Sequence, residues 1–530
     1  MIKENTKEIL IKDKKNKLLI WSIIIFFITL VSRIFVLIYV TLPGNGAIGD
    51  VYHHWQIAYL SKTIGFKNGF LRLWDFKGME YYWGLLHPLI LIIGFIISGS
   101  ISVLVAQVIS ILFASLNAVL VFLIIERYFN KNAAFFASMF FALIPTALFH
   151  DTLGLQESMG LFFLIWGIYL YSKRALASGF IWMLAGMIRA EFWIFGFALV
   201  VASILGKKKT DHKILTAIGY AIPGLIYMKY LLNWTQNPIY PVYWNFLVIG
   251  LGKWGGVRSA LDPRVESIRM LCRVFTIVPA AITFYILYKK PKFYLFYFFG
   301  FLYFTFICFL FGFSNHFQAV TYYYLNKYTW YEIVGDILVG KIFIFVEAFA
   351  GLLLSIFFLY FLPKKLGKVA AVIGSIIIIA ILASSQYLWL PIKQHYQISG
   401  EVDAAQTTAS VIAGRYSKGG KVILPSGSPN LTYFLAYNEK IPGEKMISSF
   451  YNPLYYYEGD KPFDDWGNLR QEFYNWLQKN NAELFVVTLA ELKDREGNPT
   501  DLGKIFILED KVLFNLLDEL EGYRIYEVIL

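Results

Sequence analysis

The sequence predicts a polytopic α-helical membrane protein, with about 11 transmembrane helices, followed by a small α/β domain. Composition is the first reason: 57% of the 530 residues are hydrophobic, and the mean hydropathy is +0.55. Soluble domains average about 45–50% apolar residues. The second reason is that the apolar excess is concentrated in long runs, which reach the roughly 20 residues that a membrane-spanning helix needs.

Each expected span is one of these apolar runs. The first is too long for a signal-peptide core and has no small-residue cleavage pattern, so we expect it to be retained. The run at 85–98 is short and is expected to be re-entrant or interfacial. The pair of runs around Arg189 can be half-helices. The expected spans lie near 18–42, 100–125, 133–149, 157–172, 175–188, 190–205, 213–232, 269–288, 293–313, 341–362 and 369–390.

Basic clusters predict the orientation. They precede the first span and follow the second, fourth, sixth, eighth and tenth, for example at Lys207–Lys209 and Lys289–Lys292. The positive-inside rule therefore predicts a cytoplasmic N-terminus in the plasma membrane. The long loops 43–87, 233–268 and 314–340, and the chain after residue 391, are expected outside the cytoplasm.

The chain after Pro391 differs in charge from the membrane part, which predicts two domains, 1–390 and 391–530. From residue 401 onward there are 13 Lys and Arg against 20 Asp and Glu, whereas the whole chain carries +12. The positive charge thus belongs to the membrane part, which argues against nucleic-acid binding. Strand-like runs (KVILPS, ELFVVTL, KIFILED, YRIYEVIL) alternate with helical patterns (LRQEFYNWLQKN, VLFNLLDELEG), which favours an extracytoplasmic α/β domain.

Several common site types have no sequence signal. The two cysteines, Cys272 and Cys308, both lie in apolar spans, which makes a disulfide framework or a cysteine metal site unexpected. There is also no Walker A loop, no Gly-rich dinucleotide fingerprint and no HExxH. A nucleotide-linked donor is therefore disfavoured, and a lipid-linked donor that diffuses in the bilayer is favoured.

The loop after the first span holds the candidate catalytic base, Asp50, in the segment GAIGDVYHHWQIAYLSKTIGF. A carboxylate at the membrane surface suits the removal of a proton from an acceptor hydroxyl. Asp50 also suits the N-cap of the following helix, and both functions can coexist. His53 and His54 share its helix face. They fit a metal site with Asp50, or interfacial histidines, and we retain His54 as a candidate substrate-binding residue.

Further acids lie in predicted outer loops. Glu80 is followed by Tyr81, Tyr82 and Trp83, which fit an interfacial aromatic belt or sugar stacking, and Glu80 is a candidate substrate-binding residue. Asp151 and Glu157 lie at the edges of apolar spans, where an acidic side chain costs free energy and is usually functional. They are candidate catalytic residues that bind a metal ion or orient the acceptor, with helix capping as the alternative.

Arginines are the candidate phosphate ligands. Arg189 interrupts an apolar run beside Glu191, where it can clamp a phosphate or pair with Glu191 or Asp151. Arg33, within the first span, can snorkel, pair with a buried acid or reach a pyrophosphate. Arg258 and Arg264 are the preferred loop cations for a departing polyprenyl phosphate.

Taken in order, these residues resemble the GT-C superfamily of membrane glycosyltransferases. The resemblance covers roughly residues 18–210 and is most similar to the protein mannosyltransferase and aminoarabinose transferase branch. No WWDYG is present, which argues against the oligosaccharyltransferase branch. The pattern consists of Arg33, Asp50, Tyr52, Ala58, Gly65, a Trp/Tyr-rich segment with His87-Pro88, Asp151, Glu157 and Arg189.

The resemblance implies a chemistry for these positions. Asp50 would be the catalytic base, Asp151 or Glu157 the second acid, and Arg189 a basic residue near the donor phosphate. The donor would be a polyprenyl-phosphate sugar, and the anomeric centre would be inverted. No second acid stands two residues after Asp50. A divalent cation is the only cofactor that the pattern suggests, and whether the reaction needs it is left open.

We therefore expect an integral-membrane glycosyltransferase of the cell envelope. It would transfer a hexosyl or pentosyl group to a lipid, glycan or protein acceptor at the outer face. A flippase for lipid-linked glycans would instead need charges along a midplane path and internal repeats. A polysaccharide polymerase is a further alternative, which the α/β tail and the early loop carboxylate of Asp50 disfavour.

Overall fold

The computed structural model describes residues 2–46, 49–64, 83–205, 208–245, 354–390, 392, 400–417, 419–425, 428–447, 466–493, 497–509, 513–520 and 522–529. The chain divides into two compact units. The membrane unit consists of Met1–Pro43 and Gln107–Gln397. The loop–sheet unit consists of Gly44–Ala106 and Ile398–Leu530. The segment from 44 to 106 thus groups with the C-terminal part of the chain, whereas the sequence placed it in a domain of residues 1–390.

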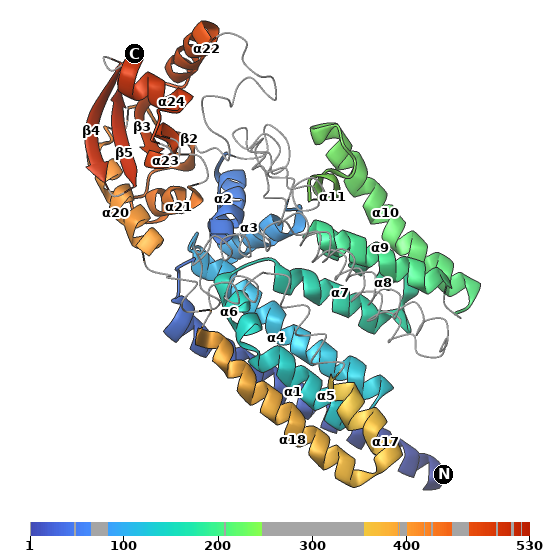
Figure 1. Ribbon diagram of the computed structural model, residues 1–530. Coiled ribbons are helices and arrows are strands. Elements are labelled where there is room, and N and C mark those ends of the chain that lie inside the picture. Colours follow the sequence, from blue (N-terminus) through green and yellow to red (C-terminus); the bar gives the residue numbers. More distant parts are fainter. Residues whose placement is uncertain are drawn as a thin grey trace, which may run out of the picture. The chain divides into compact units, whose positions relative to one another are not determined.

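The described part of the membrane unit is built from helices (Figure 1). The helix α4, Val103–Tyr128, begins in the loop–sheet unit and continues through the membrane unit. The other elements are α1 (Ile2–Val36), η1 (Leu37–Thr41), α5 (Lys131–Leu143), α6 (Pro145–Leu153), α7 (Glu157–Tyr171), α8 (Ala175–Gly186), α9 (Ala190–Leu205), α10 (Thr210–Thr235), α11 (Tyr240–Asn245), η4 (Phe357–Phe361), α17 (Leu362–Leu366), α18 (Lys368–Ser385) and η5 (Gln386–Leu388).

Four helices in the described residues are long and apolar enough to cross a membrane, or five when one bent pair counts as a single span. The four are Asn16–Thr41, Val103–Tyr128, Thr210–Thr235 and Lys368–Leu388, and each coincides with a predicted span. The predicted spans 269–288 and 293–313, and most of 341–362, lie outside the described residues. The total of about 11 spans and the orientation of the termini stay predictions.

The expected span 133–149 is broken rather than continuous. The helices α5 and α6 meet at a bend of 56°, with Pro145 at the start of α6. Proline cannot donate a backbone hydrogen bond and disfavours helical geometry in the residue before it. Ile144 accordingly has an extended backbone (φ −68°, ψ 127°), and this residue ends α5.

The next three expected spans form short helices whose bounds lie within two residues of the predicted ones. The helices α7, α8 and α9 contain 15, 12 and 16 residues. At 1.5 Å per residue this gives lengths of about 18–24 Å, less than the roughly 30 Å hydrocarbon core of a bilayer. Arg189 lies in the break between α8 and α9, as the half-helix interpretation of this pair predicted.

The close packing of α8 against α10 depends on two glycines. A Cβ at Gly179 of α8 would overlap the backbone carbonyl of Thr216, and one at Gly219 of α10 would overlap that of Leu176. Each helix therefore presents a glycine to the backbone of the other. Small residues permit this close approach where apolar burial gives little driving force between helices in lipid.

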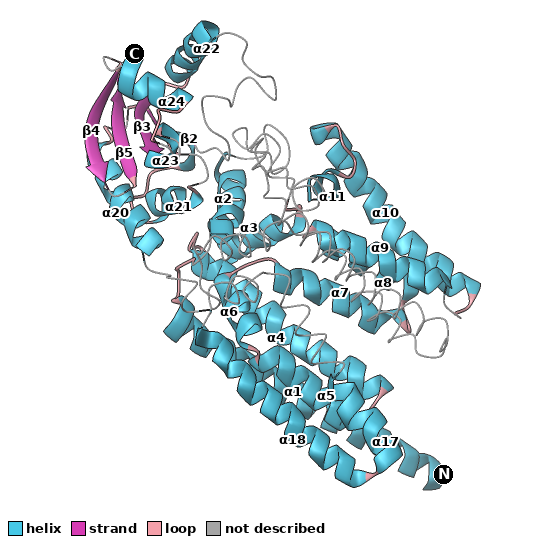
Figure 2. Ribbon diagram, viewed as in Figure 1, coloured by secondary structure: helices cyan, strands magenta, loops and turns pink. Residues whose placement is uncertain are grey.

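The loop–sheet unit contains a five-stranded mixed sheet with the strand order β2-β1-β3-β5-β4 (Figure 2). Strand β1 is parallel to β2 and β3, whereas β5 is antiparallel to β3 and β4. The elements are α2 (Gly49–Ile64), α3 (Leu86–Ser98), α20 (Gly400–Arg415), β1 (Lys421–Ile423), α21 (Pro429–Tyr437), η6 (Gly443–Lys445), β2 (Met446–Ile447), α22 (Trp466–Lys479), β3 (Ala482–Thr488), α23 (Leu489–Leu492), α24 (Asp501–Gly503), η8 (Lys504–Glu509), β4 (Phe514–Leu520) and β5 (Tyr523–Val528).

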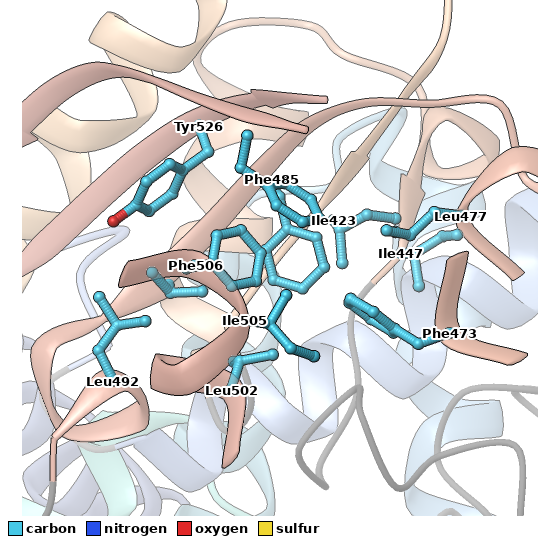
Figure 3. Close-up of a cluster of buried hydrophobic side chains, with 12 residues drawn as sticks. Ile423, Ile447, Phe473, Leu477, Phe485, Leu492, Leu502, Ile505, Phe506 and Tyr526 are labelled. Carbon is cyan, nitrogen blue, oxygen red and sulfur yellow. The ribbon is translucent and has the colours of Figure 1, made fainter. Parts of the chain in front are cut away.

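A cluster of buried apolar side chains forms the core on one face of this sheet (Figure 3). Phe473 of α22 and Phe506 of η8 pack on Phe485 of β3, with ring centroids 5.9 and 4.9 Å away. Side chains alternate between faces along a strand, so Leu484 and Val486 point to the other face, where they are also buried. Both faces of β3 are therefore covered.

Two local assignments in this region differ from the sequence prediction. The run KIFILED, expected as a strand, forms the wide helical turn η8, which inserts Ile505 and Phe506 into the core. The run VLFNLLDELEG, expected as a helix, contains strand β4, which pairs antiparallel with β5. Its Leu and Glu residues favour a helix locally, but pairing along the sheet edge overrides this weak propensity.

The glycine crossing of α8 and α10 predicts a sharp contrast between two substitutions on one helix. Gly219→Ala should lower the thermal unfolding midpoint in detergent, because its new methyl group meets backbone, and overpacking costs about 1–3 kcal/mol. Gly224→Ala should leave the midpoint unchanged or raise it, since a Cβ there lies 3.4 Å from Met183 Sδ. Equal midpoints for the two variants would contradict this packing.

Candidate functional site

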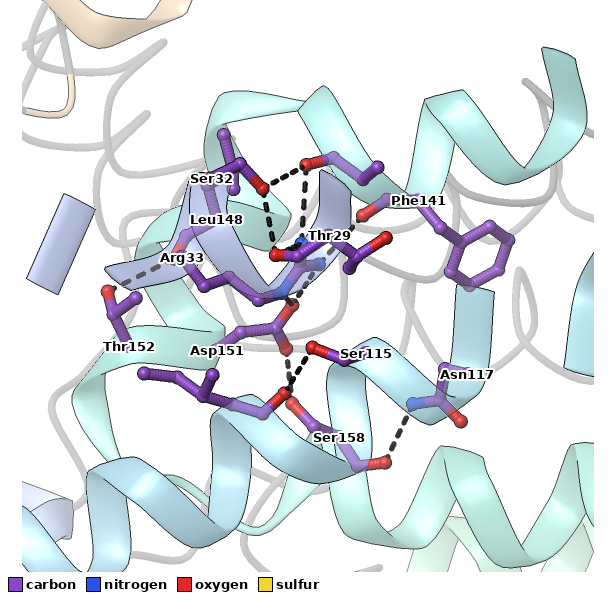
Figure 4. Close-up of polar contacts among 12 residues, drawn as sticks. Thr29, Ser32, Arg33, Ser115, Asn117, Phe141, Leu148, Asp151, Thr152 and Ser158 are labelled. Carbon is purple, nitrogen blue, oxygen red and sulfur yellow. Dashed lines mark hydrogen bonds and ion pairs between the residues drawn. The ribbon is translucent and has the colours of Figure 1, made fainter. Parts of the chain in front are cut away.

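The first membrane helix contains a fully buried arginine, Arg33, whose exposed fraction is 1%. Its guanidinium donates to Asp151 Oδ2 through Nη2 at 2.6 Å and Nε at 2.9 Å (Figure 4). It also donates to the carbonyls of Phe141 at 2.7 Å, Ala142 at 3.2 Å and Thr29 at 3.3 Å. Of the alternatives that the sequence left open for Arg33, the structure therefore has the pairing with a buried acid.

The break after α5 supplies two of these acceptors. Carbonyls in the last turn of a helix have no intrahelical donor, and Phe141 and Ala142 lie in the last turn of α5. The carbonyl of Phe140 accepts from Ile144 N, and that of Leu143 accepts from Gln386. A cation at a helix C-terminus is also favoured by the helix dipole.

The second oxygen of Asp151 continues the network into α7 and α4. Asp151 Oδ1 accepts from the hydroxyl of Ser158, which accepts in turn from Ser110 Oγ at 3.3 Å. Asn117 Nδ2 donates to the carbonyl of Ser158 at 2.8 Å. Through Asp151 the helices α1, α6, α7 and α4 are thus connected by hydrogen bonds. This arrangement favours a structural function for Asp151, whose proposed catalytic role remains a hypothesis.

A second charged cluster joins the starts of α7 and α9. Arg189 donates to both carboxylate oxygens of Glu191, at 2.7 and 2.9 Å, and also to Glu157 Oε1. All three side chains are largely buried, with exposed fractions of 16% for Arg189, 10% for Glu191 and 5% for Glu157. The pairing of Arg189 with Glu191, one of the alternatives left open above, is present, and its second partner is Glu157 rather than Asp151.

This cluster has more acid than base. When both glutamates are ionised, its formal charge is −1. Glu157 Oε2 is buried and has no hydrogen-bond partner among the described residues. Arg189 can hold a phosphate here by exchanging one carboxylate partner for a phosphate oxygen, because bidentate contacts to carboxylate and phosphate have the same geometry.

In the loop–sheet unit, the candidate base Asp50 lies in the first turn of α2, which begins at Gly49. It is partly exposed and belongs to the helix rather than to the capping position before it. The positive end of the helix dipole favours an ionised carboxylate in this turn. The ionised form is the one that can accept a proton.

Beyond Asp50, two histidines of α2 face an aromatic pocket. His53 stacks on Trp83 with ring centroids 5.5 Å apart, and His54 meets His87 edge to face at 5.0 Å. All three histidines are buried, with exposed fractions of 7% for His53 and 1% each for His54 and His87. Burial lowers the pKa of His53 to about 4. Burial also lowers the pKa of His87, to about 3, so His53 and His87 are packed as neutral rings.

Other candidate ligands are not brought into a metal site. Within the ranges that the structure describes, no group of three or more His, Cys, Asp or Glu side chains is arranged to hold a metal ion. Glu80, Arg258 and Arg264 lie outside the described residues, so their roles stay predictions. Ser158 carries no recognisable sequence signal, and it is identified only through its contact with Asp151.

Comparisons with known proteins add a result at the level of fold. No protein-family model matches the sequence, and no curated protein matches it. Among solved structures, ArnT from Cupriavidus metallidurans bound to undecaprenyl phosphate matches with a TM-score of 0.54 and 12% identity, covering 96% of this chain and 97% of that one. The apo oligosaccharyltransferase of Archaeoglobus fulgidus matches with a TM-score of 0.52 and 11% identity, over 90% and 70% of the two chains.

The chain has a GT-C fold. Both matched proteins are glycosyltransferases of the GT-C superfamily, which confirms at the level of the fold the resemblance drawn from the sequence pattern. The match to ArnT spans nearly the whole of both chains, so the GT-C likeness includes the C-terminal part as well as the helices. At 11–12% identity the likeness concerns the fold, and residue roles must be argued from this chain's own contacts.

The buried ion pair predicts a large stability loss when its acid is neutralised. Asp151→Asn leaves the Arg33 charge uncompensated, and breaking a buried pair in this way costs about 3–5 kcal/mol. We expect a clearly lower thermal unfolding midpoint in detergent. Glu519→Gln is the control, since it removes the partner of Arg524 from a pair in which Glu519 is 54% exposed, worth about 0–1 kcal/mol. Similar losses in both variants would disagree with this assignment.

The buried histidine predicts a dependence of stability on pH. The pKa of His53 is about 4 in the folded protein against an ordinary value of 6.5. Between these values the unfolded chain takes up a proton that the folded chain does not, so the free energy of unfolding falls as pH drops, by up to about 3 kcal/mol. Unfolding midpoints measured at pH 7 and pH 4.5 should differ less in His53→Gln than in the parent. An unchanged difference would show that His53 does not contribute.

Proposed function

We propose that this protein is an integral-membrane glycosyltransferase that moves one sugar from a polyprenyl-phosphate donor to an acceptor at the outer membrane face, with inversion. The observation that carries the proposal is the fold match to ArnT, which extends over 96% of this chain and was made to a structure with undecaprenyl phosphate bound. The described spans are consistent with a chain whose substrate is dissolved in the bilayer.

Asp50 is the proposed base. It follows the first membrane-spanning segment by a few residues, so a substrate headgroup at the membrane surface is within its reach. Partial exposure leaves the carboxylate accessible to an acceptor hydroxyl, and its place in the first helical turn favours the ionised form. Proton transfer to a positioned carboxylate contributes typically 10²–10⁴-fold to a rate. His54 and Glu80 are proposed to contribute to substrate binding.

Arg189 is the proposed ligand of the donor phosphate. The leaving group gains negative charge as the glycosidic bond breaks, and fixed cations stabilise it. Arg189 is held by Glu157 and Glu191, which keep the guanidinium in place until a phosphate replaces one of them. Arg258 and Arg264 are proposed as further cations. Glu157, released in this exchange, is proposed to orient the acceptor or a divalent cation, with Asp151 as the alternative.

An apolar groove offers a place for the prenyl chain. It has a volume of about 840 Å³ and belongs entirely to the membrane unit. Its lining comes from α1, η1, α5, α6 and the segment after α18, and includes Phe27, Val31, Phe35, Leu148 and Trp389. Apolar lining of this kind suits an isoprenoid chain, which has no polar groups to satisfy.

Replacement of the base tests the proposal. Asp50→Asn should fold and insert like the parent but lose at least about 100-fold in transfer rate, because it cannot accept the acceptor proton. The measurement is release of polyprenyl phosphate from radiolabelled hexosyl and pentosyl polyprenyl phosphates in proteoliposomes that contain envelope lipids as acceptors. Asp211→Asn, which changes the equivalent first-turn acid of α10, is the matched control and should keep the parental rate.

Two results would contradict the proposal. One is a parental transfer rate in Asp50→Asn. The other is movement of intact labelled donor across the bilayer without release of polyprenyl phosphate, which is the behaviour of a flippase rather than of a transferase.

A further inference from the structure

The helix that carries Asp50 is packed against the C-terminal part of the chain. In the loop–sheet unit, α2 contacts α21 and η6, which follow it by more than 360 residues in the sequence. The contact is aromatic at its centre. The ring of Tyr433 on α21 lies 5.2 Å from that of Tyr52 and 4.9 Å from that of Trp55, the latter edge to face. Tyr52, Trp55 and Tyr433 are each at most 1% exposed.

The hydroxyl of Tyr433 connects the turn before α2 to the start of α4. It donates to the carbonyl of Gly44 and accepts from the backbone N–H of Val103, both at 3.4 Å. Gly44 belongs to the turn that leads from the first span into α2, and Val103 is the first residue of α4. One side chain from α21 thus touches α2, the turn before it and the first residue of α4.

The α2 side chains next to Asp50 complete the attachment. Tyr52 accepts a hydrogen bond from Gly46 N at 3.0 Å and donates to Asn45 Oδ1 at 3.3 Å. Trp55 Nε1 donates to the carbonyl of Ile101 at 2.6 Å. These bonds fix the turn before α2 and the start of α4 to the same aromatic side chains that Tyr433 covers.

A direct hydrogen bond between α2 and α21 lies one turn further along α2. Gln56 Nε2 donates to Thr432 Oγ1 at 3.0 Å, and both residues are buried. Near the C-terminal end of α2, Gly443 of η6 approaches so closely that a Cβ there would lie 3.0–3.1 Å from atoms of Tyr59, Leu60 and Thr63. The C-terminal segment therefore holds α2 at its start, its middle and its end.

We propose that Tyr433 and Thr432 are positioning residues for the active site, which hold the first turn of α2 so that Asp50 meets the acceptor hydroxyl. The inference rests on the proposed function of Asp50. Neither residue touches the reacting atoms. The C-terminal α/β segment thereby has a defined task in the transfer reaction, namely to set the geometry of a base that lies on a distant part of the chain.

The size of the expected effect follows from the sensitivity of catalysis to geometry. A misplacement of about 1 Å can cost on the order of 10²-fold in rate even when the mutation is far from the chemistry. Tyr433→Phe keeps the ring contacts with Tyr52 and Trp55 and removes only the bridging hydroxyl, so a smaller loss of about tenfold in kcat is expected. The KM for the donor should change by less than about twofold, because binding energy is unaffected.

The experiment compares full-length Tyr433→Phe, Thr432→Val and Tyr437→Phe in proteoliposomes. Tyr437 is the matched control, because its ring stacks on that of Tyr433 at 5.3 Å, it is partly exposed, and its substitution removes the same hydroxyl group. Transfer rate per folded molecule and amide hydrogen exchange of residues 49–60 are measured for each. Tyr433→Phe and Thr432→Val should lower kcat and speed exchange in α2, whereas Tyr437→Phe should do neither.

The outcomes separate positioning from simple support of the fold. A lower yield of folded protein with unchanged kcat per folded molecule would overturn the inference. Full activity of Tyr433→Phe beside an inactive Asp50→Asn would also overturn it, while leaving the proposed function intact. Full activity of Asp50→Asn would refute the proposed function and the positioning role together. If Tyr433→Phe fails to fold, Thr432→Val decides by the same two measurements.

Discussion

The arrangement of the first helices depends on the need to neutralise Arg33. A guanidinium buried among apolar helices is stable only when its donors and its charge are satisfied. The chain meets this need with one carboxylate and with carbonyls that are available because α5 ends at Leu143. The proline breaks the span, and this break frees the backbone carbonyls to which the arginine donates. Asp151 then extends it to α7 and α4.

Composition and charge were sufficient to predict much of the membrane architecture. Four long spans, the break at Arg189, and the strands β1 and β3 with the helix α22 before β3 followed from run lengths and periodicity. The pairing of Arg33 was foreseen only as one of three alternatives, because its partner is 118 residues away and no local pattern identifies it. The strand β4 was missed for a related reason: its edge pairing with β5 is a tertiary contact, which a propensity for helix does not reveal.

The residues of the candidate site likewise include some that the sequence alone singles out and others that it does not. Asp50, Glu157 and Arg189 stand out in sequence because charged residues beside long apolar runs are rare and costly. The residues that contact Asp151 or pack on α2 do not stand out. Ser158 and Thr432 are ordinary small polar residues, and Tyr433 is one of 36 tyrosines. Their contacts follow from where the fold places them, so the sequence offers candidate charged residues but not the small polar and aromatic side chains packed around them.

The attachment of α2 to α21 also has a consequence for biogenesis. Gln56 and its partner are 376 residues apart, so α2 leaves the ribosome long before the segment that covers its aromatic face exists. Domains generally fold as units during synthesis, N-terminal ones first, but this helix cannot complete its packing in that order. Until α21 has been synthesised, Tyr52 and Trp55 lack the ring of Tyr433 that packs on them. The packing of α2 is thus completed only late in synthesis.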